Sequence, residues 1–189
     1  MTTPARVRLL DAGEQLFYAQ GIISTGVDAV AAAAGVTKPT LYAHFGKKSQ
    51  LVAAVLERRH ERRRAELEAW LEPFSPDERP LEVMGWLRNW YAAEQNERGC
   101  AFLNAAVELP DSDDPGHVAV RQEKAWFLDL LVELCRAAGL RQPETLGSQL
   151  LLLLDGVGGR AVVGGPDAAI IGAHDAYCAA QVLIAAARS

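Results

Sequence analysis

Side chains able to donate hydrogen bonds to anionic oxygens gather in one short stretch of this 189-residue chain. They are hydroxyl, ammonium and imidazole groups, carried by Thr37, Lys38, Thr40, Tyr42, His44 and Lys48. Groups of these kinds contact phosphate oxygens, and a lysine or a threonine can also reach the edge of a base in the major groove. The chemistry that this stretch suggests is therefore the binding of double-stranded DNA.

Two short helices joined by a glycine turn are expected to hold these side chains. The first runs from Thr25, its expected N-cap, to about Ala34, and Gly35 supplies the turn. The second begins after its own cap, Thr37. At the start of its helix, Thr25 would also offer its hydroxyl and the helix amides to a phosphate. In a purely structural alternative, both threonines only cap helices and Tyr42 only packs.

The charges of the chain divide unevenly along its length. Residues 1–64 hold ten Lys/Arg and five Asp/Glu, whereas residues 65–189 hold nine and nineteen. This split predicts a basic N-terminal DNA-binding domain, residues 1–64 with its motif at 25–48, on an acidic body, residues 65–189. The arginine-rich run that ends at Arg64 is expected to be the solvated face of a long helix, with a further attraction for DNA as the alternative.

The whole chain is expected to be all-α, with about nine helices. Pro, Gly or Asp residues mark every break, and no run alternates as a strand would. No apolar run reaches the ~18 residues of a membrane span, and no apolar signal core opens the chain, so we expect a cytoplasmic protein without a membrane segment. Histidines and cysteines are scattered and no catalytic motif is present, so we predict no metal, no cofactor and no enzyme.

The segment from Thr25 to Lys48 resembles the DNA-binding domain of the TetR family of transcriptional regulators. The resemblance is carried by Thr25, Val27, Ala31, Ala33, Gly35, Val36, Thr40, Leu41, Tyr42, His44, Phe45 and Lys48. It implies three N-terminal helices, a long fourth helix and a helical regulatory domain that forms a two-fold dimer. By analogy, the DNA contacts would come from Thr25, Thr37, Lys38, Thr40, Tyr42, His44 and Lys48. The sequence departs from the family pattern at Ala43 and Ser49.

The family dimerises through its last two helices, and the helix expected near residues 144–163 fits that role. It is apolar on more than one face and carries interior glycines, which let a partner backbone approach closely. The expected interface residues are Leu150, Leu153, Val157, Gly158, Ala161, Ala173, Ala176 and Ala180. Packing within one chain is the alternative.

Similar proteins enclose a small-molecule effector among their fourth to seventh helices, and the corresponding region of this chain, about residues 47–138, is rich in aromatic residues. An apolar cavity with few polar groups is the usual form of such a site. The candidate lining residues are Trp90, Phe102, Asn104, Trp126 and Leu130. The alternative is that aromatic residues at helical spacing form an ordinary core.

The resemblance implies a homodimeric, sequence-specific DNA-binding regulator. Its expected form is a repressor that a small-molecule effector releases from a palindromic operator. The alternative is a DNA-binding protein of the same fold that is controlled by a partner protein or has no effector.

Overall fold

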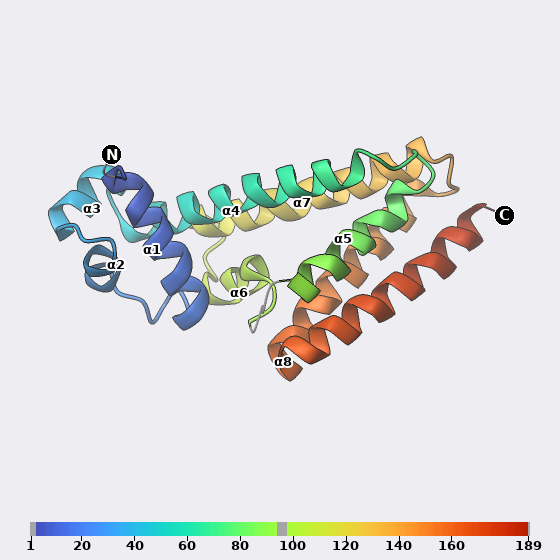
Figure 1. Ribbon diagram of the computed structural model, residues 1–189. Helices are drawn as coiled ribbons and strands as arrows, with labels where there is room; N and C mark the ends of the chain where they lie inside the picture. The colour runs from blue at the N-terminus through green and yellow to red at the C-terminus, as the bar shows by residue number, and fades with distance from the viewer. Residues whose placement is uncertain (1–2, 94–97, 189) are drawn as a thin grey trace. The chain divides into compact units, whose positions relative to one another are not determined.

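The structure is a computed structural model that describes residues 3–93 and 98–188. Within these ranges the chain forms eight helices and no strand (Figure 1), which confirms the all-α prediction. The helices are α1 (Ala5–Gln20), α2 (Val27–Ala33), α3 (Lys38–Phe45), α4 (Lys48–Leu71), α5 (Arg79–Ala93), α6 (Ala101–Glu108), α7 (Pro115–Ala137) and α8 (Pro143–Arg188). The sequence predicts a helix over about residues 77–95, and the predicted end of this helix, near Gln95, lies outside the described residues.

Two of the predicted helices appear as the single element α8. Its backbone leaves the helical conformation at Gly165, where φ is 73°, and Pro166 follows inside the element. The sequence predicts the same break, because it places the end of one helix at Gly164 and Gly165 and the start of the next after Pro166. A positive φ suits glycine, and proline cannot donate a backbone hydrogen bond, so both residues favour a break here. We therefore describe α8 as two helical segments.

The chain divides into two compact units. The first unit consists of Met1–Arg62 and Ala101–Glu123, and the second of Arg63–Cys100 and Lys124–Ser189. The short helix α6 thus belongs to the same unit as the N-terminal helices. The functional boundary near Arg64 stays a prediction.

In the first unit, α1, α2 and α3 pack against one another (Figure 1). Each supplies buried apolar side chains to the contact, among them Leu9, Val30 and Leu41, none of which is exposed. The turn between α2 and α3 closes at Gly35, whose φ is 62°, as the sequence predicts. These contacts matter because helices as short as α2 and α3 are not stable on their own.

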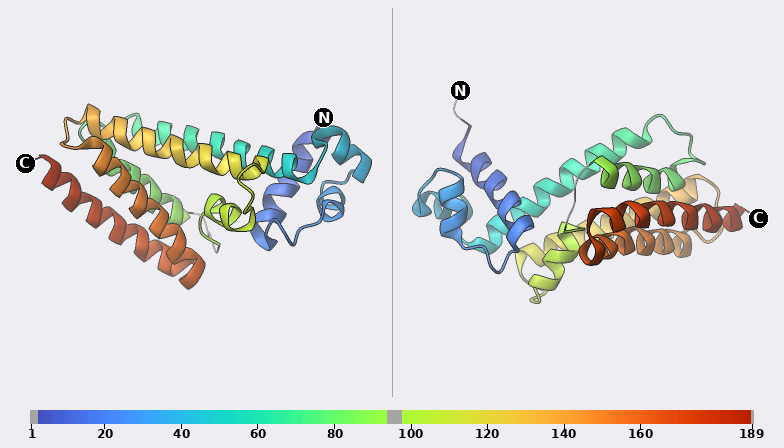
Figure 2. Two further views of the ribbon diagram at one scale, coloured as in Figure 1. Left: turned by 180° about the vertical axis from the view of Figure 1, so that it is seen from behind. Right: turned by 60° about the horizontal axis from the view of Figure 1, so that its bottom comes forward.

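In the second unit, α5 lies beside α8 (Figure 2). The core includes Val83 and Met84 from α5, Phe127 and Leu131 from α7, and Leu150 from α8. All five of these side chains are fully buried. By length and composition α8 is also apolar enough to cross a membrane. However, the break at Gly165 and the burial of one face of each segment in this core are typical of the core helix of a globular protein.

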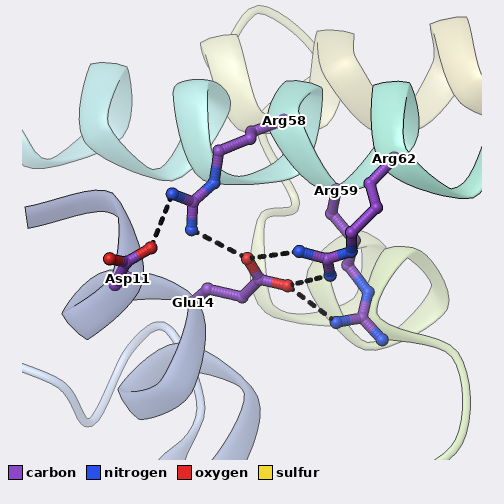
Figure 3. A network of polar contacts seen from close by, with 5 residues as sticks. All are labelled: Asp11, Glu14, Arg58, Arg59 and Arg62. Carbon is purple, nitrogen blue, oxygen red and sulfur yellow. Dashed lines mark hydrogen bonds and ion pairs between the residues drawn. The ribbon is translucent and has the colours of Figure 1, made fainter. Parts of the chain in front are cut away.

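A network of ion pairs joins α1 to α4 within the first unit (Figure 3). The Glu14 carboxylate accepts hydrogen bonds from Arg58 at 2.9 Å and from Arg59 at 3.0 Å, and it also pairs with Arg62. Arg58 donates a further bond to Asp11 at 2.7 Å. The expected solvated face is therefore wrong for Arg59, which is buried, and for Arg58, which is half-buried, whereas Arg62 is exposed although it also pairs with Glu14.

The environment of Glu14 controls its protonation. Partial burial alone would raise the pKa of this carboxyl group, but the hydrogen bonds and positive charges of Arg62, Arg58 and Arg59 outweigh that effect. Together they lower the pKa from its ordinary value of 4.5 to about 2. A carboxyl group whose pKa is lower in the folded state stabilises that state above its unfolded pKa. The stabilisation is lost as the pH falls from about 4.5 towards 2.

We predict that Glu14→Gln lowers the free energy of unfolding by about 2 kcal/mol at pH 7, because it leaves three arginines without their shared anion. The difference from the wild type should shrink as the pH falls below 4.5. Urea unfolding followed by circular dichroism at pH 7, 4 and 3 measures both effects. The control is Glu57→Gln, which neutralises an exposed carboxylate on α4. Equal stability of Glu14→Gln and wild type at pH 7 would contradict the role of the network.

Candidate nucleic-acid interface

Helix α3 presents a polar face because its apolar residues point inward. Leu41 is fully buried and Phe45 is 8% exposed, whereas Tyr42 is 41% exposed. The hydroxyl of Thr37 accepts a hydrogen bond from the backbone amide of Thr40 at 3.3 Å, which confirms the predicted N-cap. The cap and the two apolar anchors fix the orientation of the helix, so its remaining side chains face solvent.

Lys38 stands at the start of this exposed face. Its ammonium group donates a hydrogen bond to Oδ2 of Asp28 in α2 at 3.0 Å, and both side chains are largely exposed. The hydrogen bond and charge of Asp28 raise the pKa of Lys38 above its ordinary value of 10.5. The lysine is therefore charged at neutral pH. An incoming phosphate or base must compete with Asp28 for it.

The exposed face continues to the end of α3 and into α4. His44 is exposed in the last turn of α3. Lys48 begins α4, and its ammonium group lies 3.5 Å from the carbonyl oxygen of Ile23. Lys48 is only half-buried. An ammonium group has three donors, so it can hold this loop and still bind an anion.

The structure corrects the role predicted for Thr25. The N-cap of α2 is Gly26, with no side-chain hydrogen bond, and Thr25 is 1% exposed. Its hydroxyl donates to the carbonyl oxygen of Gly21 at 2.7 Å, directly after the end of α1. The capping prediction is wrong because the hydroxyl satisfies a carbonyl group inside the chain. A buried hydroxyl cannot reach a phosphate, so Thr25 is not a DNA contact.

Sequence reasoning missed a contact between α6 and the loop before α2. Oε2 of Glu108 accepts a hydrogen bond from the backbone amide of Ile23 at 2.8 Å. The carboxylate also lies over Gly21, where a Cβ atom would come within 3.0 Å of Oε2. Gly21 has a φ of 91°, a conformation that suits glycine. Nothing in the sequence links Glu108 to residues so far away, although the glycine indicates a close approach.

The predicted effector residues fall in both units. Trp90 belongs to the core of the second unit, and Trp126 and Leu130 pack against that core. Phe102 and Asn104 lie on α6 in the first unit, where Phe102 is fully buried and Asn104 lines a cavity. Trp90 packs edge-on against Tyr91, with the ring centres 4.9 Å apart, as an ordinary core residue does.

Most of the predicted dimer residues lie in the core of their own chain. Side chains with little or no exposure are not available to a second molecule, so the prediction is wrong for them. They are Leu150, Val157, Ala161, Ala173, Ala176 and Ala180, each 5% exposed or less. Gly158 is also buried, and Leu153 is half-buried. The second unit needs this face of α8 for its own core, so the apolar pattern does not by itself identify a face for a second molecule.

The opposite face of α8 is open. On the first segment Leu152 is 69% exposed and Val163 is 91% exposed. The exposed glycines between them, Gly156 and Gly159, face open space, since a Cβ atom at either position would meet nothing within 4 Å. These four residues follow helical spacing and form one stripe. On the second segment the corresponding stripe is formed by Ile171, Asp175, Cys178 and Val182, all exposed.

Both the N-terminal helices and the chain as a whole are similar to known proteins. Residues 9–55 match the family model of bacterial regulatory proteins of the tetR family. The crystal structure of a TetR-family transcriptional regulator from Streptomyces coelicolor is similar with a TM-score of 0.89. It shares 32% identity, over 98% of this chain and 96% of that one. The reduced form of Escherichia coli NemR has a TM-score of 0.81 at 20% identity, covering 96% of this chain and 97% of that one, and so shares the fold.

A curated relative agrees with this result. The HTH-type transcriptional repressor ComR of Escherichia coli K12 is 33% identical over 108 residues, which are 56% of this chain. The match spans only about half, 51%, of the length of ComR. Because the match to the Streptomyces coelicolor regulator extends over nearly all of both chains, and α2 and α3 form a helix-turn-helix, the protein belongs to the TetR family and is a DNA-binding transcriptional regulator rather than an enzyme.

Proposed function

We propose that this protein is a homodimeric repressor that binds a palindromic operator and is released from it by a small-molecule effector. The observation that carries the proposal is the exposed polar face of α3, which two buried apolar residues, Leu41 and Phe45, hold in place. In a helix-turn-helix, the second helix lies in the major groove and its N-terminal residues contact base edges.

The proposed contacts divide by chemistry. Lys38, at the start of α3, reads a guanine or binds a phosphate, and Thr40 reaches a thymine methyl group or a phosphate. Tyr42, His44 and Lys48 donate to phosphate oxygens and fix the position of the helix in the groove. Thr37 contributes chiefly as the cap, because its hydroxyl is already bound to Thr40.

Dimerisation is proposed through the open stripes of α8. Each stripe carries exposed apolar side chains, such as Leu152 and Val182, and the stripe on the first segment also has two exposed glycines, Gly156 and Gly159, that let a second backbone approach. A two-fold dimer would present two copies of α3 to half-sites about 34–36 Å apart, one turn of DNA. Such spacing explains why the operator is expected to be palindromic.

Release by an effector follows from linkage. The proposed ligand binds better to a form of the dimer in which the two copies of α3 cannot reach both half-sites, and so it weakens DNA binding. Because the coupling is reciprocal, DNA weakens the binding of the ligand by the same factor. ComR, to which the chain is similar over 108 residues, is named a repressor, and this supports the sign of regulation that we propose.

We predict that Lys38→Ala and Tyr42→Ala each weaken operator binding by about tenfold or more, because each removes a DNA contact. If Lys38 binds a phosphate, Lys38→Ala should also reduce the salt dependence of log K by about one unit of slope. The operator is a site selected from a random DNA library, and fluorescence anisotropy between 50 and 200 mM salt measures both quantities. Arg121→Ala, which removes an exposed charge from α7, is the control. Undiminished binding by both α3 variants would refute the contact assignment.

We predict that Leu152→Glu and Val182→Glu convert the dimer to a monomer at micromolar concentration, because each buries an unpaired charge in the interface. Sedimentation velocity measures the change. The matched control is Val107→Glu on α6, which places the same charge at a position that is 84% exposed. Dimers that survive both α8 substitutions would place the interface elsewhere.

A further inference from the structure

A cavity lies inside the first unit, between α1, α4 and α6. Its walls are mainly apolar and include Phe17, Val52, Val55, Leu56, Ala101 and Ala105. The space open to the centre of a water-sized sphere is about 30 Å³, and the space free of protein atoms, with the open mouth included, is about 420 Å³. Apolar concave sites with a few polar groups are the usual form of small-molecule sites. A space between these two measures admits at most a small molecule, about the size of one substituted ring.

The polar groups at this cavity indicate the charge of the ligand. Glu14, Arg59 and Glu108 all line it, so two carboxylates face one guanidinium group. Arg59 already donates to Glu14 at 3.0 Å. Arg58 and Arg62 pair with the same carboxylate, so Glu108 is the acid at the cavity that lies outside this network, and its charge would repel an anionic ligand. A full positive charge would lose its hydration among the apolar walls. A neutral molecule that carries one hydrogen-bond donor fits both conditions.

The acceptor for such a donor is on α6. Asn104 and Glu108 are one helical turn apart, and both line the cavity. Glu108 also holds the loop before α2 through the amide of Ile23, at 2.8 Å. One carboxylate thus belongs both to the cavity wall and to the support of the helix-turn-helix.

We propose that this cavity binds a small neutral ring compound with one hydroxyl donor, such as a phenol, and that the ligand donates to Glu108. The bond draws the carboxylate away from the amide of Ile23 and releases the loop between Gly21 and Thr25. The loop leads directly into α2, so its release disturbs the position of α3. The effect on DNA rests on the function proposed above, whereas the binding of the ligand does not.

Phenol binding to the full-length protein tests the site directly. Titration followed by NMR should show saturable binding with a dissociation constant of about 1 mM, as expected for so few ligand atoms. Ala101→Leu, which fills the cavity, should weaken binding at least tenfold. Ala106→Leu makes the same change on α6 at a residue that does not line the cavity, and should leave binding within twofold.

Two further probes test the chemistry of the ligand. Toluene has no donor and should bind several-fold more weakly than phenol, and benzoate should bind more weakly still. Toluene binding as tight as that of phenol would overturn the hydrogen bond to Glu108, and tighter binding of benzoate would overturn the charge argument. Absence of saturable phenol binding, or equal binding by wild type and Ala101→Leu, would overturn the site itself.

The coupling to DNA is tested with Glu108 variants and the selected operator. Without phenol, Glu108→Gln should bind the operator within about twofold of wild type, because its amide oxygen still accepts from Ile23. Glu108→Ala loses that bond and should bind less tightly. Saturating phenol should weaken operator binding by wild type about tenfold, and by Glu108→Gln less.

These measurements separate the two proposals. Phenol binding with no effect on operator affinity would overturn the coupling through Glu108. Failure to select any operator would count against the proposed function, while the phenol titrations would still decide whether the cavity binds a ligand.

Discussion

The helix that faces DNA is too short to be stable alone, and the rest of the first unit compensates for this. An isolated helix of eight residues, the length of α3, is unstable in water because the first turn costs more conformational entropy than one hydrogen bond returns. Its stability therefore comes from the burial of Leu41 and Phe45 and from the Thr37 cap. The packing partner α1 is in turn fixed to α4 by Glu14 and its three arginines. The polar face of α3 is therefore exposed because Leu41 and Phe45, on its opposite face, are buried against the rest of the unit.

The ion pairs around Glu14 also explain part of the positive charge of residues 1–64. Residues 1–64 carry an excess of positive charge, but Arg58, Arg59 and Arg62 direct their guanidinium groups at one carboxylate. Their contribution to the attraction of DNA is reduced by that neutralisation, and part of the excess serves to hold helices together. Lys38 is also paired with a carboxylate, Asp28, but that pair is largely exposed and can be exchanged for contacts with DNA.

The sequence predicts local features of the fold well. Gly35, Thr37 and Gly165 have conformations or caps that follow from residue type alone, and each was predicted at the correct position. Features that depend on distant residues could not be predicted. Thr25 resembles a cap, yet its hydroxyl bonds to the carbonyl oxygen of Gly21, and only the folded loop brings these groups together. The contact between Glu108 and Ile23 joins residues 85 positions apart in the chain.

The faces of α8 show a second limit of sequence reasoning. An element that is apolar on several sides does not reveal which side packs within its own chain and which is open. Leu150 and Leu152 are of one residue type and two positions apart, yet one is fully buried and the other is 69% exposed. The difference is set by α5 and by the core that it shares with α8.

The break at Gly165 has a consequence for how the chain folds. It lets the two segments of α8 meet, so that Gly172 lies against the side chain of Arg160. Contacts so close in sequence form quickly, because little loop-closure entropy opposes them. The exposed stripes can therefore be present on a helical hairpin before the proposed dimer forms. Gly156 and Gly159 on the first stripe have low β-propensity, which disfavours pairing of that stripe with another chain as a strand.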